Sequence, residues 1–230
     1  MKKITVLCLF LLSLYVHADM VITESVDLGG QNMTMTMKIK GDKIRMDVSP
    51  QVSTIIDSKT GDVLTMMHSM KSYMVISGDK AKAMIEQVNK FKSPPAASEA
   101  PVVKPTLVDT GKSEKVGNFN TEIYTLKGSA TNMTLWVTKD IPNYAELQEQ
   151  FKKLQNLTNL GPVASLTPDT GDVQGFPVKT QMESNGKTIT STITSVEEKT
   201  VEDAEMAPPA GYSKISIPDF GGSGPHPSQP

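Results

Sequence analysis

The sequence predicts an α+β fold in which β-structure dominates, built as one curved antiparallel sheet covered by two amphipathic helices. Short runs of alternating apolar and polar residues follow one another along the chain, and a period of two is typical of half-buried strands. Two other stretches repeat apolar residues with helical spacing. A sheet of roughly nine to eleven strands tends to curl, so helices on its concave side would enclose an apolar volume.

The start of the chain has the pattern of a secretory signal peptide. Met1 to Lys3 is short and basic, and Ile4 to Val16 is an almost unbroken apolar run, too short to span a bilayer comfortably. We expect residues 1–18 to be cleaved and the protein to be periplasmic or secreted. Cys8 lies inside the apolar run rather than at its end, which argues against lipoprotein processing.

One domain is expected over residues 19–217, followed by a flexible Gly- and Pro-rich tail over 218–230. Without Cys8 the mature chain has no disulfide, so burial alone must hold the fold together. A chain of this length can bury a sizeable core. The formal net charge is −2 and the basic residues are spread thinly, so nucleic acid is excluded as a partner.

The N-terminal half is expected to form a meander of strands. The predicted strands are 20–28, 32–40, 43–48, 53–57, 62–67 and 72–76. Turn residues such as Gly29-Gly30 and Gly41-Asp42 separate them. Asp79 is the predicted N-cap of a first helix over 80–91, which carries apolar residues at helical spacing.

The C-terminal half begins with a Pro-, Ala- and Ser-rich stretch over 93–105, which we interpret as an exposed loop. Strands are predicted at 115–126 and 132–138, then at 173–183 and 188–196 around an Asn-Gly hairpin turn. Between these pairs, Asn143 is the predicted N-cap of a second amphipathic helix, with Glu146 completing a capping box.

Methionines give the sequence its most specific signal. In "NMTMTMKIK" the alternation places Met33, Met35, Met37 and Ile39 on one face of a strand. Methionine is unbranched and polarizable, so a surface rich in it adapts to ligands of variable shape. These side chains either fill the core, line an apolar cavity or bind copper(I). The cavity hypothesis assigns as lining residues Met33, Met35, Met37, Ile39, Met66, Tyr73 and Trp136.

A copper(I) site is the alternative use of these methionines. Thioether sulfur with one imidazole suits that soft ion, and "MMHSM" offers Met66, Met67, His68 and Met70. Threonines, rather than acids or histidines, separate the methionines of the second strand, which weakens this hypothesis.

Catalytic motifs are lacking. Beyond the signal peptide the chain has only His68 and His226, so a Ser-His-acid arrangement would depend on His68. The sequence has no nucleophile elbow, zinc-protease motif, P-loop or dinucleotide-binding glycine motif. We therefore expect a protein that is not an enzyme and uses no cofactor.

Six short stretches, taken in order, resemble a family of bacterial exported proteins known as DUF4412. They are "MKIKGDKIRMD" (37–47), "TIIDSKTGDVLTM" (54–66), "KSYMVI" (71–76), "LWVTKDI" (135–141), "GFPVKT" (175–180) and "MAPPAGYSKI" (206–215). That family is similar to the LolA and LolB type of lipoprotein carrier, whose fold is a half-open β-barrel closed by helices over a hydrophobic cavity. In those carriers an early-strand arginine helps to gate the lid, so the resemblance implies this role for Arg45.

The sequence thus predicts a non-catalytic monomer that binds a lipid, an acyl chain or a lipidated protein, with peripheral association with the cell envelope. Two alternatives stay open: a copper(I)-binding envelope protein, and a ligand-free interaction or sensor module with a filled interior. The latter would contact its partner through the 93–105 loop or the tail.

Overall fold

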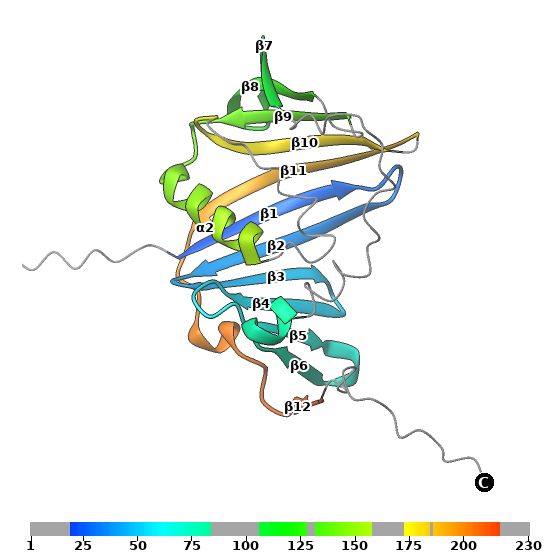
Figure 1. Ribbon diagram of the computed structural model, residues 1–230, viewed down its shortest axis with the longest axis vertical. Helices are drawn as coiled ribbons and strands as arrows, with labels where there is room; N and C mark the ends of the chain where they lie inside the picture. The colour runs from blue at the N-terminus through cyan, green and yellow to red at the C-terminus, as the bar shows by residue number, and fades with distance from the viewer. Residues whose placement is uncertain (1–18, 84–105, 128–131, 158–172, 185, 217–230) are drawn as a thin grey trace, which may run out of the picture.

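The computed structural model describes residues 19–83, 106–127, 132–157, 173–184 and 186–216 (Figure 1). The predicted signal peptide, the 93–105 loop and the 218–230 tail lie outside these residues. The first half of the sheet comprises β1 (Met20–Asp27), β2 (Asn32–Lys40), β3 (Lys43–Ser49), β4 (Val52–Asp57), β5 (Val63–Met67) and β6 (Ser72–Ile76). The second comprises β7 (Thr106–Val116), β8 (Phe119–Lys127), β9 (Asn132–Thr138), β10 (Phe176–Ser184), β11 (Lys187–Glu198) and β12 (Ser213–Lys214).

These strands form one 12-stranded sheet in the order β12-β6-β5-β4-β3-β2-β1-β11-β10-β9-β8-β7. Neighbours are antiparallel except β12, which pairs with β6 in parallel. β1 lies between β2 and β11 and so joins the two halves. Figure 1 shows that the sheet is curved and does not close, with β7 and β12 at its two edges. The prediction of a β-dominant, curved antiparallel sheet is confirmed.

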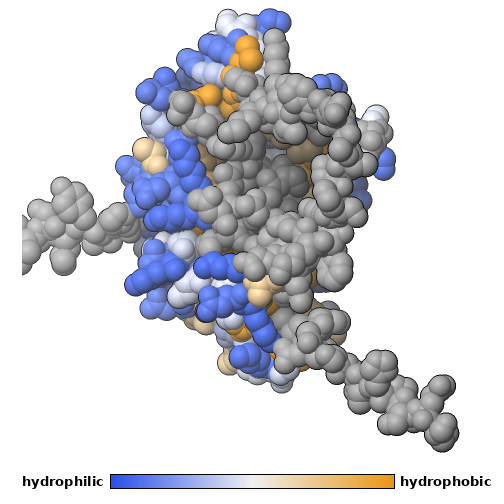
Figure 2. All heavy atoms as spheres, in the orientation of Figure 1, coloured by the Kyte–Doolittle hydropathy of each residue, from blue (hydrophilic) through white to orange (hydrophobic). Residues whose placement is uncertain are grey.

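One face of the sheet, which we call the inner face, is packed beneath the helix α2 (Tyr144–Leu157). Met37 pairs with Ile22 on β1 and Met46 on β3, and directly paired residues share a face. These side chains contribute to two hydrophobic clusters that cover neighbouring parts of this face. α2 adds Leu147 and Phe151 to the larger cluster. In Figure 2, hydrophilic residues lie over the opposite side of this helix.

The start of α2 differs in detail from the prediction. The helix is confirmed, but Asn143 has a φ of 54°, in the left-handed region, whereas an N-cap residue is normally extended. The side-chain amide of Asn143 donates to Glu198 at 3.4 Å. Asn143 therefore occupies the predicted N-cap position, directly before Tyr144, but in a left-handed rather than an extended conformation.

The first predicted helix starts earlier than expected. Helical residues run over 78–83, and the remainder of the predicted 80–91 helix lies outside the described residues. The backbone N–H of Lys80 donates to the Ser77 hydroxyl at 3.3 Å, and that of Ala81 donates to the Ser77 carbonyl at 2.8 Å. Ser77 rather than Asp79 therefore caps this helix. A second helix covering the sheet stays a prediction.

Two strands were not expected. The single strand predicted over 115–126 is a hairpin of β7 and β8, because Gly117 adopts a φ of 57° that permits a tight turn. β12 belongs to an extended segment, residues 199–216, which we call the C-terminal strap. The strap contains the short helix η2 (Asp203–Met206) and ends beside β6. These two additional strands explain why the sheet has 12 strands rather than the roughly nine to eleven predicted.

Candidate functional site

The inner face continues along β2 beyond the cluster that α2 covers. Met37 and Ile39 pack against that cluster, near the end of β2. Met33 and Met35 lie toward its beginning and are half-buried. They pair with Val26 and Glu24 of β1. Strand pairing continues this end of the face onto β11, and we define the methionine face as Glu24, Val26, Met33, Met35, Ser191 and Ile193.

A carboxyl group interrupts the methionine face. Glu24 pairs with Met35 on one side and with Ile193 on the other, so its side chain emerges among apolar neighbours. The Ser191 hydroxyl donates a hydrogen bond to Glu24 Oε1. Burial raises the pKa of Glu24, and the hydrogen bond from Ser191 opposes that rise.

Met66 and Tyr73 do not lie on the methionine face. Met66 pairs with Ser53 on β4 and with Tyr73 on β6, which places all three on the outer face of the sheet. Met67, one position later, pairs with Val52 and points to the inner side. Side chains alternate between the two faces along a strand, so an error of one residue in register assigns a side chain to the wrong face. For this reason Met66, predicted to line the cavity, lies on the opposite face of the sheet.

Trp136 packs in the core cluster rather than on the methionine face. Its indole N–H donates to Glu114 Oε2 at 2.7 Å, and the ammonium of Lys179 lies 4.1 Å from its ring centroid. Both contacts suit a buried aromatic ring with one polar atom. The structure therefore keeps Met33, Met35, Met37 and Ile39 together and separates Met66, Tyr73 and Trp136 from them.

Arg45 also lies on the outer face. It pairs with Lys38 and Ile55, whereas its strand neighbours Ile44 and Met46 point inward. Its guanidinium donates to Asp47 Oδ1 at 2.8 Å and to the backbone carbonyl of Glu205 at 2.7 Å. The position implied for Arg45, at a lid over the cavity, is not the one it occupies. Arg45 instead binds the C-terminal strap.

A chain of polar contacts extends from Asp47 to the strap. The Ser53 hydroxyl donates to Asp47 Oδ1 at 2.5 Å and lies 2.7 Å from His68 Nε2, and His68 Nδ1 lies 2.7 Å from the Tyr212 hydroxyl. Burial raises the pKa of Asp47, but hydrogen bonds from Ser53 and Arg45 outweigh it and leave the pKa below its usual range. We give the name His68 network to five residues: Arg45, Asp47, Ser53, His68 and Tyr212.

Two side chains of η2 strengthen the attachment of the strap. Lys38 forms an ion pair with Glu205, which lowers the pKa of that carboxyl, and Lys40 lies 3.1 Å from Asp203. The strap is therefore attached to β2, β3 and η1 (His68–Met70) as well as to β6.

The four candidate copper ligands do not converge. Met66 is fully buried on the outer face, Met67 points to the inner side and Met70 is 63% exposed. Both ring nitrogens of His68 lie within hydrogen-bond distance of protein oxygens. Within the described residues, no group of three or more His, Cys, Asp or Glu side chains is placed to hold a metal ion.

The His68 network contains serine, histidine and aspartate, but in an order unsuited to nucleophilic catalysis. A catalytic triad places histidine between serine and the acid. Here Ser53 lies between His68 and Asp47, and its single proton is donated to Asp47. Ser53 is also only 2% exposed. This arrangement can fix the strap, whereas His68 cannot accept the serine proton in it.

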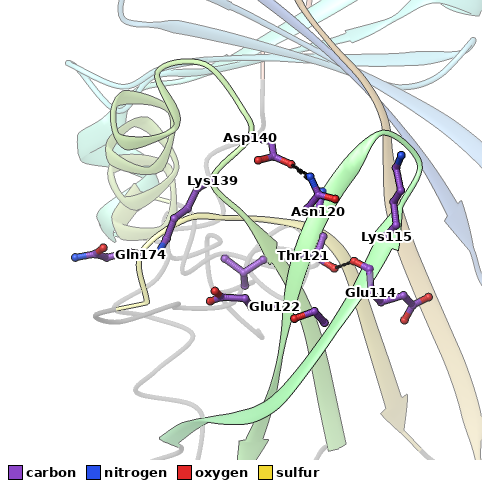
Figure 3. Close-up of a pocket in the computed structure, with 10 residues that line it drawn as sticks. Glu114, Lys115, Asn120, Thr121, Glu122, Lys139, Asp140 and Gln174 are labelled. Atoms are coloured by element: carbon purple, nitrogen blue, oxygen red, sulfur yellow. Dashed lines mark hydrogen bonds between the residues drawn. The ribbon is translucent and has the colours of Figure 1, made fainter.

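A polar cleft of about 480 Å³ lies beside the β7–β8 hairpin (Figure 3). It is lined by Ser113, Glu114, Lys115, Asn120, Thr121, Glu122, Val137, Lys139, Asp140 and Gln174. Asp140 accepts hydrogen bonds from the backbone and side-chain amides of Asn120, at 2.8 and 3.0 Å. Acidic and basic groups are mixed, so the cleft favours neither ionic sign. No sequence motif marked this cleft, because strand pairing and the turn after β9 assemble it.

No helix among the residues that the structure describes is both long and apolar enough to cross a membrane. Fold and site together define a β-dominant protein with a curved, unclosed antiparallel sheet. The chain belongs to the family described as domain of unknown function DUF4412, which matches residues 17–212. The family resemblance noted from the sequence is thus confirmed.

No curated protein matches the chain. Solved structures with some similarity include PNGF-II in a C2 crystal form (13% identity, TM-score 0.39), and the alignment covers 82% of this chain and 29% of that one. Another is LprF from Mycobacterium bovis (10%, 0.32), covering 79% and 87%. A third is a LolA superfamily protein from Nitrosomonas europaea (10%, 0.27), covering 83% and 89%. The chain thus spans less than a third of PNGF-II.

Proposed function

We propose that this protein is a non-catalytic binder of a lipid, an acyl chain or a lipidated protein, working as a monomer in the periplasm or outside the cell. The observation that carries the proposal is the methionine face. Met33 and Met35 lie on the inner face of a curved sheet, beyond the cluster packed under α2, and they are only half-buried. Flexible thioether side chains at such a position suit an apolar ligand of variable shape.

The energetics of apolar burial are sufficient for this function. Each methylene removed from water contributes about 0.8 kcal/mol, so ten carbons contribute about 8 kcal/mol. Part of this gross gain offsets the freedom lost on association, so the dissociation constant is weaker than the roughly 1 μM that 8 kcal/mol alone would give. Affinity at this level needs no polar contacts, so the binding site requires only shape and apolar surface.

A non-catalytic role is supported by the order of contacts in the His68 network. The hydroxyl of Ser53 is buried and donates to Asp47, and the imidazole of His68 contacts the strap through Tyr212. Each of these groups has a structural partner. Such a network stabilises the attachment of residues 199–216 and provides no activated nucleophile.

The test is native mass spectrometry of the protein purified without detergent and then incubated with phospholipid, fatty acid or copper(I). We expect a lipid-sized mass increment on the wild-type protein and on Thr34→Asp, since Thr34 is exposed on the other face of β2. Met35→Asp places a charge on the methionine face and should abolish the increment.

Two results would contradict the proposal. One is a wild-type protein that gains no mass with any lipid. If it also binds no copper(I), an interaction module is favoured, and if it retains copper(I) alone, a copper(I) carrier is favoured. The other is a folded Met35→Asp protein that loads lipid as the wild type does, which would place the ligand elsewhere.

A further inference from the structure

Glu24 occupies a position where the sheet calls for an apolar residue. On β1 its neighbours on the same face are Ile22 and Val26, which are 3% and 2% exposed. Across the strands it faces Met35 and Ile193. Four apolar side chains therefore surround the carboxyl group on the face to which the proposed function assigns the ligand.

The described residues leave this carboxyl without a cation. Ser191 donates to Oε1, and no lysine or arginine in the described part of the chain forms an ion pair with Glu24. A carboxylate withdrawn from water is costly unless it is paired, and an apolar residue would serve folding better at this position. Burial raises the pKa of Glu24, in keeping with that cost. Charged groups kept at such positions are candidates for function.

We propose that Glu24 selects the ligand, which carries a positively charged nitrogen next to its acyl chain. This inference rests on the proposed function and specifies it further. Ser191 engages Oε1 and fixes the carboxylate, so Oε2 accepts a hydrogen bond from the ammonium group. The chain of the ligand lies along Met33 and Met35.

The Ser191 hydrogen bond leaves the second carboxylate oxygen of Glu24 as an acceptor, which suits a cationic donor rather than an anion. Ser191 acts as the donor and the carboxyl group as the acceptor. An anionic carboxylate attracts ammonium groups and repels the carboxylate of a free fatty acid. The methionine face should therefore discriminate between amphiphiles of equal chain length by the charge of their head group.

The test compares three probes with the same chain: dodecylamine, dodecanol and dodecanoate, each below its aggregation concentration at pH 7.5. Isothermal titration calorimetry should show that the wild-type protein binds dodecylamine at least about tenfold more tightly than dodecanoate, as expected for a hydrogen bond to a charged group. Glu24→Gln should lower the affinity for dodecylamine about tenfold. Its affinity for dodecanol should stay within about twofold, since the alcohol carries no charge.

Glu197→Gln is the matched control. Glu197 is exposed on β11 and pairs with Val21 on the outer face, so its substitution should change none of the three affinities. Ser191→Ala keeps the carboxylate and should keep the preference for the amine, with a smaller ratio.

The outcomes separate the two proposals. One outcome is that the protein binds dodecanol and binds dodecylamine and dodecanoate with equal affinity. This outcome would overturn the role of Glu24 but not the apolar site. The same holds for a Glu24→Gln protein that retains the wild-type preference. Binding of none of the three probes would overturn both proposals. The wild-type comparison needs no variant, so it decides the question even where Glu24→Gln does not fold.

Discussion

Replacing Arg45 by methionine tests whether this residue attaches the C-terminal strap or gates a ligand site. The side chain of Arg45 is 14% exposed and that of its partner Asp47 is 27% exposed, so their ion pair is largely shielded from water. Methionine retains the apolar length of the arginine stem and removes its donors. After the substitution, Ser53 is the remaining hydrogen-bond donor to Asp47 within the His68 network.

The cost follows from the contacts that are lost. Arg45 donates to Asp47 at 2.8 Å, to the Glu205 carbonyl at 2.7 Å and, with weak geometry, to Ser53 at 3.4 Å. Breaking a buried ion pair costs about 3–5 kcal/mol and an exposed pair about 0–1 kcal/mol, so this partly buried pair should cost about 3 kcal/mol. For a chain of this size, that loss lowers Tm by roughly 6–12 °C.

Two measurements check this prediction. Calorimetry should show the fall in Tm, and hydrogen exchange should show faster exchange in residues 201–215, where the strap contacts β3 and β6. Lys43→Met is the matched control, because Lys43 is an exposed cation two residues earlier on the same face of β3. It should change Tm by about 1–2 °C at most.

Lipid loading gives the opposing result. Arg45 lies on the outer face, so Arg45→Met should load lipid as the wild type does at a temperature where both are folded. A variant with unchanged Tm and unchanged strap exchange but reduced loading would refute the attachment role and restore the gating role that the family resemblance implies.

Two further predictions concern stability. Burial alone would raise the pKa of Asp47, but its hydrogen bonds lower the pKa by more than burial raises it. The group is therefore a stronger acid in the folded protein than in the unfolded chain. It therefore stabilises the fold above its unfolded pKa of about 4, and this contribution is lost as pH falls through the lower folded value. Urea unfolding at pH 6, 4 and 3 should show that the free energy of unfolding declines less steeply with pH in Asp47→Asn than in the wild type. Equal slopes in the two proteins would contradict the role of Asp47 in the His68 network. Gly78→Ala should cost about 1–3 kcal/mol in urea unfolding, because its Cβ would lie 2.2 Å from the Thr60 carbonyl oxygen, and wild-type stability would show that the backbone there can shift.

The meander could be predicted from the sequence because its information is local. Alternation with a period of two and glycine-rich turns define β1 to β6 without knowledge of the rest of the chain. The same alternation correctly placed Met33, Met35, Met37 and Ile39 together. It could not place Met66 relative to them, since the face on which a residue lies depends on the register between strands.

Non-local contacts account for what the sequence did not show. The "MAPPAGYSKI" stretch has no periodicity, and Tyr212 reaches His68 across 144 residues of sequence. The polar cleft depends on strand pairing in the same way. Glu24 is different: in "VITESVD" it takes an apolar position of the alternation between Ile22 and Val26, so its unusual placement could have been read from the sequence.

The central place of β1 has a consequence for the order in which this protein folds. β2 to β6 pair with their sequence neighbours, but β1 pairs with β11 in a register that joins Met20 to Glu198. Contacts between such distant residues slow folding, because a long loop must close before they form. A chain that ends before β11 would leave the backbone donors and acceptors on one side of β1 unpaired. Such an intermediate exposes a strand edge in the middle of the future sheet, which makes it prone to pair with other chains until synthesis reaches residue 198.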